Sequence, residues 1–383
     1  MATFRFRLLV LISAFVLAYL TFPWLIYFGD YVRQTNPWSG QKYTELAFTA
    51  SGDELACLHG RPLPSEESKD EAAAAAKGKN TLEPKPIPNI VHFVFGLKNP
   101  LVKSRAGNFD FLWYLAVRSA LVSIKPEKLY LHYTYLPGPE ASAADADDKD
   151  VTMHDPLANP WIKRLSKDIE LVHHKPAPSS GPDQDSPARY AHLSDTLRLD
   201  LLQSQGGIYL DMDSFALRSF EELRNPPAGH DIILGHEGGN RWGLCNAVML
   251  ARPNSTFLTR WIKSYENVDL SKEWNYHSVL LPKEMATAHP DEVCTLAPDA
   301  FFWPTWTWRH VDWMHESLNA KDAEYWSGQI KKHGGSLFEN QRAYHAWSQM
   351  AFERYLGKLT PEVIRTRDTR FNFLMRRFLE DDL

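Results

Sequence analysis

The segment SQGGIYLDMDS, residues 204–214, predicts a short buried strand that ends in two carboxylates. Side chains alternate along a strand, so Leu210 faces one side of the sheet while Asp211 and Asp213 both face the other. The two carboxylates would then project together from the carboxyl end of the strand. Open α/β sheets bind their ligands at this end.

A helix is predicted immediately before this strand. The segment HLSDTLRLDLLQSQ carries Leu193, Leu197 and Leu201 four residues apart, which is the spacing of one helix face. Gly206 or Gly207 can end this helix in the left-handed conformation. Helix, tight turn, strand and acid pair would therefore form one rigid unit.

Two kinds of charged pair in this unit favour a ligand site. Two hard oxygen groups at a strand end can hold Mn²⁺ or Mg²⁺ with positions left open for phosphate oxygens. Asp195 and Arg198 are three residues apart, so they lie on neighbouring turns of one helix face. For each pair taken alone, a solvated acidic turn or an ion pair within the helix is the alternative.

The rest of the chain predicts an α/β fold, a doubly wound and mainly parallel sheet flanked by helices. The segment IPNIVHFVFG, which begins at Ile87, is typical of a buried strand, and the folded domain is expected to span residues 87–383. Further strands are predicted at 128–135 and 168–174, with a helix at 109–124.

The segment SDTLRLDLLQSQGGIYLDMD, residues 194–213, resembles the nucleotide-sugar motif of glycosyltransferase family 32 and of related glucosylating toxins. That motif reads S-D-x-x-R followed by G-G-x-Y-x-D-x-D. The segments IPNIVHFVFG and GLCNAVMLARP look like further core strands of the same family. The resemblance implies a Rossmann-like domain of GT-A type that transfers a hexose from a nucleotide sugar, with retention of configuration and with Mn²⁺ as cofactor.

The resemblance also implies a role for each motif residue. Asp195 and Arg198 would bind hydroxyls of the donor sugar. Asp211 would reach ribose and sugar hydroxyls, and Asp213 would be the principal metal ligand, so these two are the expected catalytic residues. Asn246, in the segment CNAVM, would face the donor sugar, with a buried capping asparagine as the alternative.

Candidates toward the C-terminus are a histidine and several tryptophans. His345 would be a further metal ligand and Trp347 would donate its indole N–H to the leaving phosphate, although the family usually has a Ser-Trp pair at longer spacing after the histidine. A core histidine beside a core tryptophan is the alternative. One or two of Trp303, Trp306 and Trp308 are expected to line an acceptor cleft, and the others to be structural.

The N-terminus predicts a membrane anchor. Residues 8–28 carry no charge and are long enough to cross a bilayer as a helix. Arg5 and Arg7 precede them, which predicts a cytosolic tail at 1–7 and type II topology, with a cleavable signal peptide as the alternative. A polar stem is expected at 29–86. The enzyme would then reside in the Golgi or another membrane of the secretory pathway, with its catalytic domain in the lumen.

Net charge, cysteine spacing and a glycosylation sequon indicate which partners and modifications to expect. The formal net charge of -5 argues against nucleic acid as a partner. Cys57, Cys245 and Cys294 lack metal-site spacing, and a bridge from Cys245 to Cys294 is one possibility that sequence cannot assign. Asn254 begins an N-glycosylation sequon, so the chain is expected to be a glycoprotein.

Several functional alternatives stay open at this level. The family contains membrane-anchored transferases for GDP-mannose and for UDP-hexoses, and the acceptor would be a glycan, a glycolipid or a small molecule. The loop EGGN, residues 237–240, either contacts the acceptor or only forms a turn. The terminal segment 365–383 either rests on a membrane or docks on the domain. A silent carbohydrate-binding protein of the same fold and a nucleotide-sugar hydrolase are the rival functions.

Overall fold

The computed structural model describes most of the chain after residue 85 and shorter segments before it. The described residues are 11–22, 24–25, 28–29, 48–61, 85–97, 108–136, 155–175, 187–227, 229–266 and 275–383. The predicted cytosolic tail and most of the predicted stem lie outside these ranges.

A seven-stranded sheet forms the centre of the molecule, in the order β3-β2-β1-β4-β7-β6-β8. Four of its pairings are parallel, and only β7 runs antiparallel to its neighbours β4 and β6. The predicted mainly parallel sheet is confirmed. The strands are β1 (Ile90–Phe95), β2 (Lys128–Tyr133), β3 (Glu170–His173), β4 (Gly207–Leu210), β6 (Ile232–Glu237), β7 (Gly243–Ala251) and β8 (Val293–Leu296).

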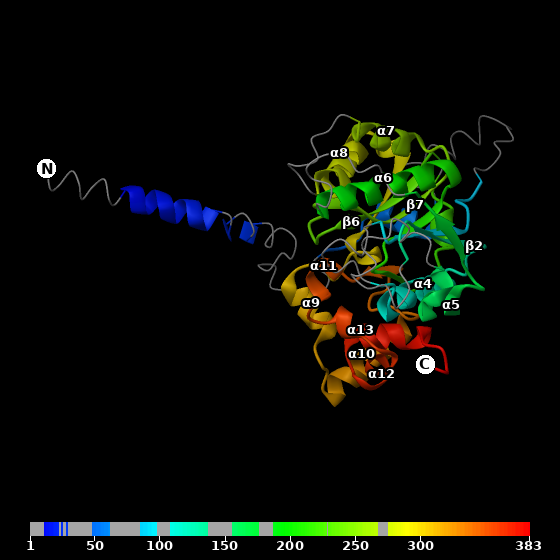
Figure 1. The fold of residues 1–383 in the computed structure, drawn as a ribbon. Helices are drawn as coiled ribbons and strands as arrows, with labels where there is room; N and C mark the ends of the chain where they lie inside the picture. The colour runs from blue at the N-terminus through cyan, green and yellow to red at the C-terminus, as the bar shows by residue number, and fades with distance from the viewer. Residues whose placement is uncertain are drawn as a thin grey trace, which may run out of the picture.

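Helices cover both faces of this sheet. Helices α6, α7 and α8 lie on one side, and α4 and α5 lie on the other together with the C-terminal helices (Figure 1). The helices with described bounds are α2 (Gly52–His59), α4 (Phe111–Ser123), α5 (Pro160–Leu165), α6 (Pro187–Gln205), α7 (Thr256–Ser264), α8 (Leu281–Ala288), α9 (Trp308–His315), α10 (Ala320–Lys332), α11 (Ser348–Ala351), α12 (Pro361–Thr366) and α13 (Arg370–Met375).

Two glycines connect α6 to β4, as the sequence predicts. Gly206 has a φ of 67°, and its N–H bonds the carbonyl of Leu202, which ends the helix. A Cβ at Gly207 would lie 2.4 Å from the carbonyl oxygen of Ile90 on β1. Only glycine therefore allows β4 to begin so close to its neighbour.

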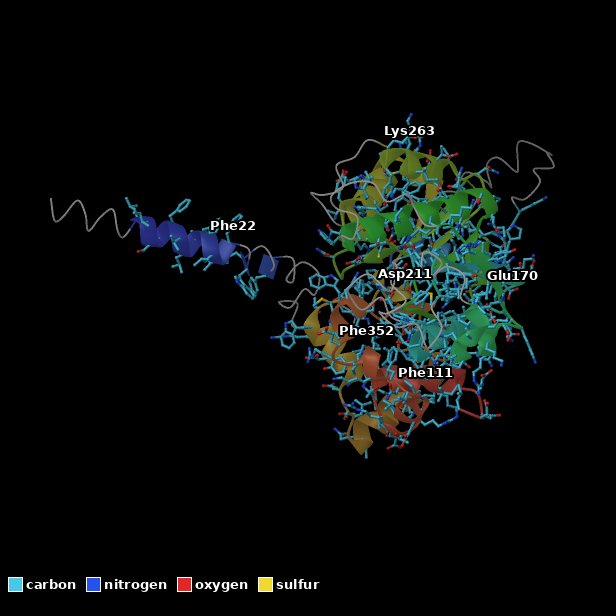
Figure 2. All side chains as sticks on the ribbon, viewed as in Figure 1. Phe22, Phe111, Glu170, Asp211, Lys263 and Phe352 are labelled. Atoms are coloured by element: carbon cyan, nitrogen blue, oxygen red, sulfur yellow. A yellow bond between two sulfur atoms is a disulfide. The ribbon has the colours of Figure 1, made fainter. Side chains whose placement is uncertain are left out.

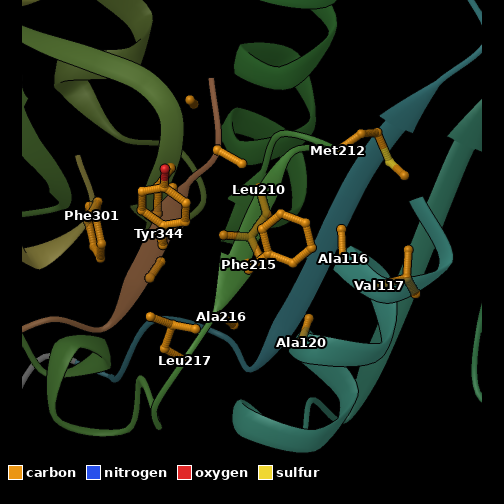
Figure 3. Close-up of a cluster of buried hydrophobic side chains, with 14 of the residues drawn as sticks. Ala116, Val117, Ala120, Leu210, Met212, Phe215, Ala216, Leu217, Phe301 and Tyr344 are labelled. Atoms are coloured by element: carbon orange, nitrogen blue, oxygen red, sulfur yellow. The ribbon is translucent and has the colours of Figure 1, made fainter. Parts of the chain in front are cut away.

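A second, two-stranded sheet brings the C-terminal region to the acid pair. Strand β5 (Ser214–Ala216) pairs antiparallel with β9 (Ala343–His345), so that Ser214 lies opposite His345. Its core contacts are apolar: Phe215 lies between Tyr344 and Ala116 of α4 (Figure 3). This packing fixes β9 beside the segment that contains the two aspartates.

Part of the predicted stem belongs to the folded domain. Helix α2 begins at a capping box formed by Ser51 and Glu54, and it buries Ala56 and Leu58. Cys57 on α2 forms a disulfide with Cys294 on β8, with Cα atoms 5.7 Å apart. The expectation that the domain starts at residue 87 is therefore too late, because the folded unit also includes residues 48–61.

The possible bridge from Cys245 to Cys294 is wrong, and Cys245 is a free, buried thiol. Cys245 lies on β7 and Cys294 on β8, and β6 runs between these two strands. Two strand spacings put the backbones about 10 Å apart, whereas bridged cysteines need Cα atoms within about 7 Å. A sheet order that sequence does not reveal decides the pairing.

The two ends of the chain are the segments for which a membrane contact was considered. Helix α13 buries Phe371, Leu374 and Met375 in the domain, so the docked alternative holds for the terminal segment. At the other end, residues 11–22 are helical, with exposed apolar side chains that include Phe22 (Figure 2). In the parts of the chain that the structure describes, no helix has both the length and the apolarity needed to cross a membrane.

Candidate functional site

Asp211 follows β4 directly and is held from three directions. Its backbone N–H bonds the carbonyl of Ala247 on β7 at 2.8 Å, and its carbonyl accepts the N–H of Ser214 at 2.8 Å. The hydroxyl of Tyr209 donates to its Oδ1 at 2.7 Å. The carboxylate is therefore fixed at the carboxyl end of the strand, near the centre of the molecule (Figure 2).

Asp211, Asp213 and His345 form a group that could hold a metal ion. Each offers one ligand atom, and these atoms all lie within 4.8 Å of one another. Nε2 of His345 is 3.1 Å from Oδ1 of Asp213. Two carboxylates and an imidazole suit Mn²⁺ and also fit Mg²⁺, and three protein ligands leave positions open for phosphate oxygens.

The charges in this group differ in their environment. Burial opposes ionisation of Asp213, but His345 and Ser348 outweigh it and hold the pKa of this carboxyl far below its usual value. The backbone N–H of Ser348 donates to Asp213 Oδ2 at 2.8 Å. Burial raises the pKa of Asp211, although Arg198 counteracts part of that effect. Asp213 is therefore the carboxylate that stays charged most firmly.

Beside the acid pair, Asn246 joins Asp195 and Arg198 of α6. Its Nδ2 donates to Asp195 Oδ1 at 2.7 Å, and its Oδ1 accepts from Arg198 Nη1 at 3.0 Å. The same Arg198 nitrogen lies 3.0 Å from Asp211 Oδ1, and the guanidinium stacks over Tyr209, 4.6 Å from the ring centroid. The structure thus brings the predicted donor-binding residues from three elements into one hydrogen-bonded network.

This network forms one wall of a cavity of about 430 Å³. Asp195, Arg198, Asp211 and Asn246 line it together with His345. Large hydrophobic pockets with a few convergent polar groups are the usual ligand sites of enzymes. These residues, which were selected from distant segments of the sequence, therefore meet at one concave site. Asp213 does not line the cavity but contacts His345, which does.

Trp347 lines the same cavity but differs from its expected contact. Its indole Nε1–H donates to the carbonyl of Pro304 at 2.8 Å, so this N–H is engaged within the protein. The ring centroid lies 4.2 Å from that of His345 in a T-shaped arrangement. In this structure, Trp347 holds the His345 ring in place.

The three predicted acceptor tryptophans lie in different environments. Trp306 lines the cavity. Trp303 is fully buried, with its ring 4.7 Å from that of His310, so it packs in the core and does not contact a ligand there. Trp308 is 48% exposed and does not line the cavity. Of the three, Trp306 alone lines the cavity.

Sequence analysis missed several cavity residues. Glu237 was named only within the loop 237–240, as an acceptor contact or part of a turn, and Cys245 only as one end of a possible disulfide; both line the cavity. Ser278, in the helical turn Tyr276–Leu280, and Asn275, the residue before this turn, also line the cavity. This segment contains no known motif. The position of Glu237 at the end of a strand was the one available signal.

Asn254 of the sequon is exposed in the turn before α7. Its φ of 61° is left-handed, a conformation that asparagine tolerates better than most residues. Ser255, the next residue, caps α7 by accepting the N–H of Leu258. The asparagine side chain is therefore accessible on the surface.

Comparisons with known proteins match this chain to a family, to two curated proteins and to solved structures. The family described as a glycosyltransferase sugar-binding region containing a DXD motif matches residues 145–230. Glucan organizing enzyme 1 of Cryptococcus neoformans var. grubii is 33% identical over 303 residues, which cover 76% of this chain and 71% of that protein. Subversion of eukaryotic traffic protein A of Legionella pneumophila is 31% identical over 91 residues, 24% of this chain and 14% of that protein. The glycosyltransferase GlyE of Streptococcus pneumoniae matches with a TM-score of 0.39 and 11% identity, over 77% of this chain and 61% of that one.

Proposed function

Because the chain belongs to the glycosyltransferases whose sugar-binding region contains a DXD motif, we propose that it transfers a hexose from a nucleotide sugar to a hydroxyl group. The observation that carries this proposal is the shared cavity. The network of Asp195, Asn246 and Arg198 lies beside the metal-ligand group of Asp211, Asp213 and His345. A nucleotide sugar presents sugar hydroxyls and a diphosphate side by side, which is the pair of chemistries that these residues match.

The residues of the network have distinct roles in this proposal. Asp195, Arg198 and Asn246 bind the hydroxyls of the donor sugar, and Asp211 reaches from the sugar to the ribose. Asp213 and His345 hold the divalent cation, Mn²⁺ or Mg²⁺, together with Asp211. When bound, the cation would stabilise the charge that develops on the diphosphate as it leaves. Trp347 packs against the His345 ring in a T-shaped contact.

The finer points of the reaction are also proposals. We propose GDP-mannose as the first donor to test, and this choice rests on the family resemblance alone. UDP-hexoses are the alternative. We propose retention of configuration by attack from the front face, with the leaving diphosphate assisting deprotonation of the acceptor. NMR of the product's anomeric proton tests this, and an inverted product would contradict it.

We further propose that the apolar segment 8–28 anchors the chain in a Golgi or other secretory membrane, with the catalytic domain in the lumen. Residues 8–10, 23 and 26–27 of this segment lie outside the described ranges. The Cys57–Cys294 disulfide supports a lumenal domain, because such bridges persist in oxidising compartments. Exposed Asn254 would then be glycosylated. Glycosidase digestion should reduce the mass of the wild-type chain and not of Asn254→Gln, and equal shifts would contradict this site.

The experiment that tests the activity uses the full chain in detergent. Release of nucleoside diphosphate is measured with Mn²⁺ across a panel of GDP- and UDP-sugars, with and without octyl glycosides as acceptors. A transferase releases diphosphate from one donor faster when an acceptor is added. Release that no acceptor accelerates favours the hydrolase, and a chain that turns over no donor favours the silent carbohydrate-binding protein.

A further inference from the structure

Glu237 lines the cavity, but the proposed donor and metal sites do not use it. It is the last residue of β6 and is 5% exposed. A buried carboxyl is costly unless something stabilises it, so its presence in a ligand cavity calls for a role.

The sheet order separates Glu237, at the end of β6, from Asp211, which follows β4, because strand β7 lies between them. Strand β7 runs between β4 and β6, and its residues Cys245 and Ala247 line the cavity between the two neighbours. Ala247 bonds the N–H of Asp211 on one side, and Cys245 pairs with Gly235 on the other. The backbones of β4 and β6 are therefore about 10 Å apart, two strand spacings. This separation leaves room for a second substrate beside the donor.

The Glu237 carboxyl has two neutral hydrogen-bond donors and also interacts electrostatically with the His345 imidazole. The thiol of Cys245 and the indole of Trp306 donate hydrogen bonds to it, and no Lys or Arg pairs with it in the described part of the chain. Burial raises its pKa to about 7, with His345 and these two donors opposing that effect. A carboxylate can accept about four hydrogen bonds, so two protein donors leave capacity for a ligand hydroxyl.

We propose that Glu237 binds the acceptor: its carboxyl accepts a hydrogen bond from the hydroxyl group that attacks the donor sugar. Trp242 and Trp306 line the cavity as well, and their aromatic rings suit the apolar faces of a sugar. By contrast, the residues proposed to bind the donor hydroxyls, Asp195 and Arg198, are both hydrogen-bonded to Asn246. This inference rests on the proposed transferase function and adds the residue that selects its second substrate.

The test compares Glu237→Gln with wild type in the full chain, with Mn²⁺ and the donor that the panel identifies. Three octyl glycosides, of glucose, galactose and mannose, serve as acceptor probes, and water serves when no glycoside reacts. Calorimetry gives the Kd of the nucleoside diphosphate, which also reports that the variant is folded. Glu170→Gln is the matched control, because exposed Glu170 lies on the edge strand β3, where it pairs with Lys128 of β2.

The expected result separates the two substrates. Glu237→Gln should lower turnover at fixed acceptor about 10- to 100-fold and raise the acceptor KM, because it loses one charge-assisted hydrogen bond. The Kd of the nucleoside diphosphate should stay within about twofold. Trp306→Phe keeps the ring but removes the N–H donor, so it should raise the acceptor KM to a smaller extent. If Glu237→Gln does not fold, the acceptor KM of Trp306→Phe tests the proposed acceptor site instead.

Two results would overturn the inference. Unchanged turnover and acceptor KM would show that Glu237 is structural, and a parallel loss of diphosphate affinity would assign it to the donor site. Failure of the proposed function looks different, since the wild-type chain itself would then release no diphosphate from any donor.

Discussion

Nε2 of His345 lies 3.1 Å from Oδ1 of Asp213, although the two residues belong to segments far apart in the chain. The pairing of β5 with β9 holds them together, with Ser214 opposite His345. We expect His345→Ala to weaken Mn²⁺ affinity at least about tenfold, because it removes one of the three ligands. Titration followed by electron paramagnetic resonance measures this.

A histidine elsewhere on the surface provides the control for this prediction. His289 lies near Glu292, outside the cavity, and His289→Ala should leave Mn²⁺ affinity unchanged. Equal Mn²⁺ affinities for His345→Ala and wild type would remove His345 from the metal site.

The bridge that Asn246 makes between Asp195 and Arg198 predicts a sensitive position for donor binding. Asn246→Asp keeps the shape but places a carboxylate where the amide donates to Asp195 at 2.7 Å, so the two charges repel. We expect kcat/KM for the donor to fall at least about tenfold. Steady-state kinetics with varied donor measure this, and Asn319→Asp at the N-cap of α10 is the control. A donor kcat/KM equal to that of wild type would speak against the network as the sugar site.

The disulfide predicts which thiol reacts. Alkylation of the denatured, unreduced chain followed by peptide mapping should label Cys245 and neither Cys57 nor Cys294. Label on Cys57 would indicate the pairing that the sheet order excludes. In addition, Cys57→Ser should lower the free energy of unfolding by about 2–4 kcal/mol, because it frees a long loop in the unfolded chain.

Three histidines form a chain across the strands and predict sensitivity to acid. His92 donates from Nε2 to the carbonyl of Gly206, His132 donates to His92, and His174 donates to His132. In this order His92 and His132 each donate from Nε2 and accept at Nδ1, so these two rings must be neutral. Burial lowers the pKa of His92 to about 4 and that of His132 to about 3.

The sign follows from the difference between the folded and unfolded states. An unfolded histidine titrates near 6.5, so the unfolded chain binds more protons below that pH. The free energy of unfolding is therefore highest above pH 6.5 and falls toward pH 4, by about 3 kcal/mol from His92 alone. Denaturant titrations at several pH values measure this. His132→Gln can keep both hydrogen bonds without a titrating group and should show a shallower fall, and an unchanged slope would contradict the account.

The local unit around the acid pair could be predicted because short-range rules govern it. Alternation in β4, the turn at Gly206 and the spacing of Asp195 and Arg198 all follow from neighbouring residues. The family that these residues resemble is confirmed by the comparisons. The network around Asn246 depends on which strand lies next to β4. The family resemblance pointed to Asn246 without that order, and left a buried capping asparagine as the alternative.

Features that depend on the order of distant strands could not be predicted. Cys57 forms a disulfide with Cys294 because α2 packs on β8. No sequence pattern in the segment before residue 61 predicts that contact. Trp303 and Trp306 look alike in sequence, but one is core and the other lines the cavity. Glu237 joins the site only because β6 is separated from β4 by one strand.

The measurement that tests the central claim most directly is metal-dependent diphosphate release by the full chain and by Asp213→Asn. Asp213 is the carboxylate that His345 and Ser348 keep charged, so its loss should remove the cation without a change of shape. We expect wild type to release nucleoside diphosphate from one donor with Mn²⁺ and not with EDTA, and the variant to be slower by about 10²-fold or more. Release that persists in EDTA or in Asp213→Asn, or no release from any donor, would contradict the account.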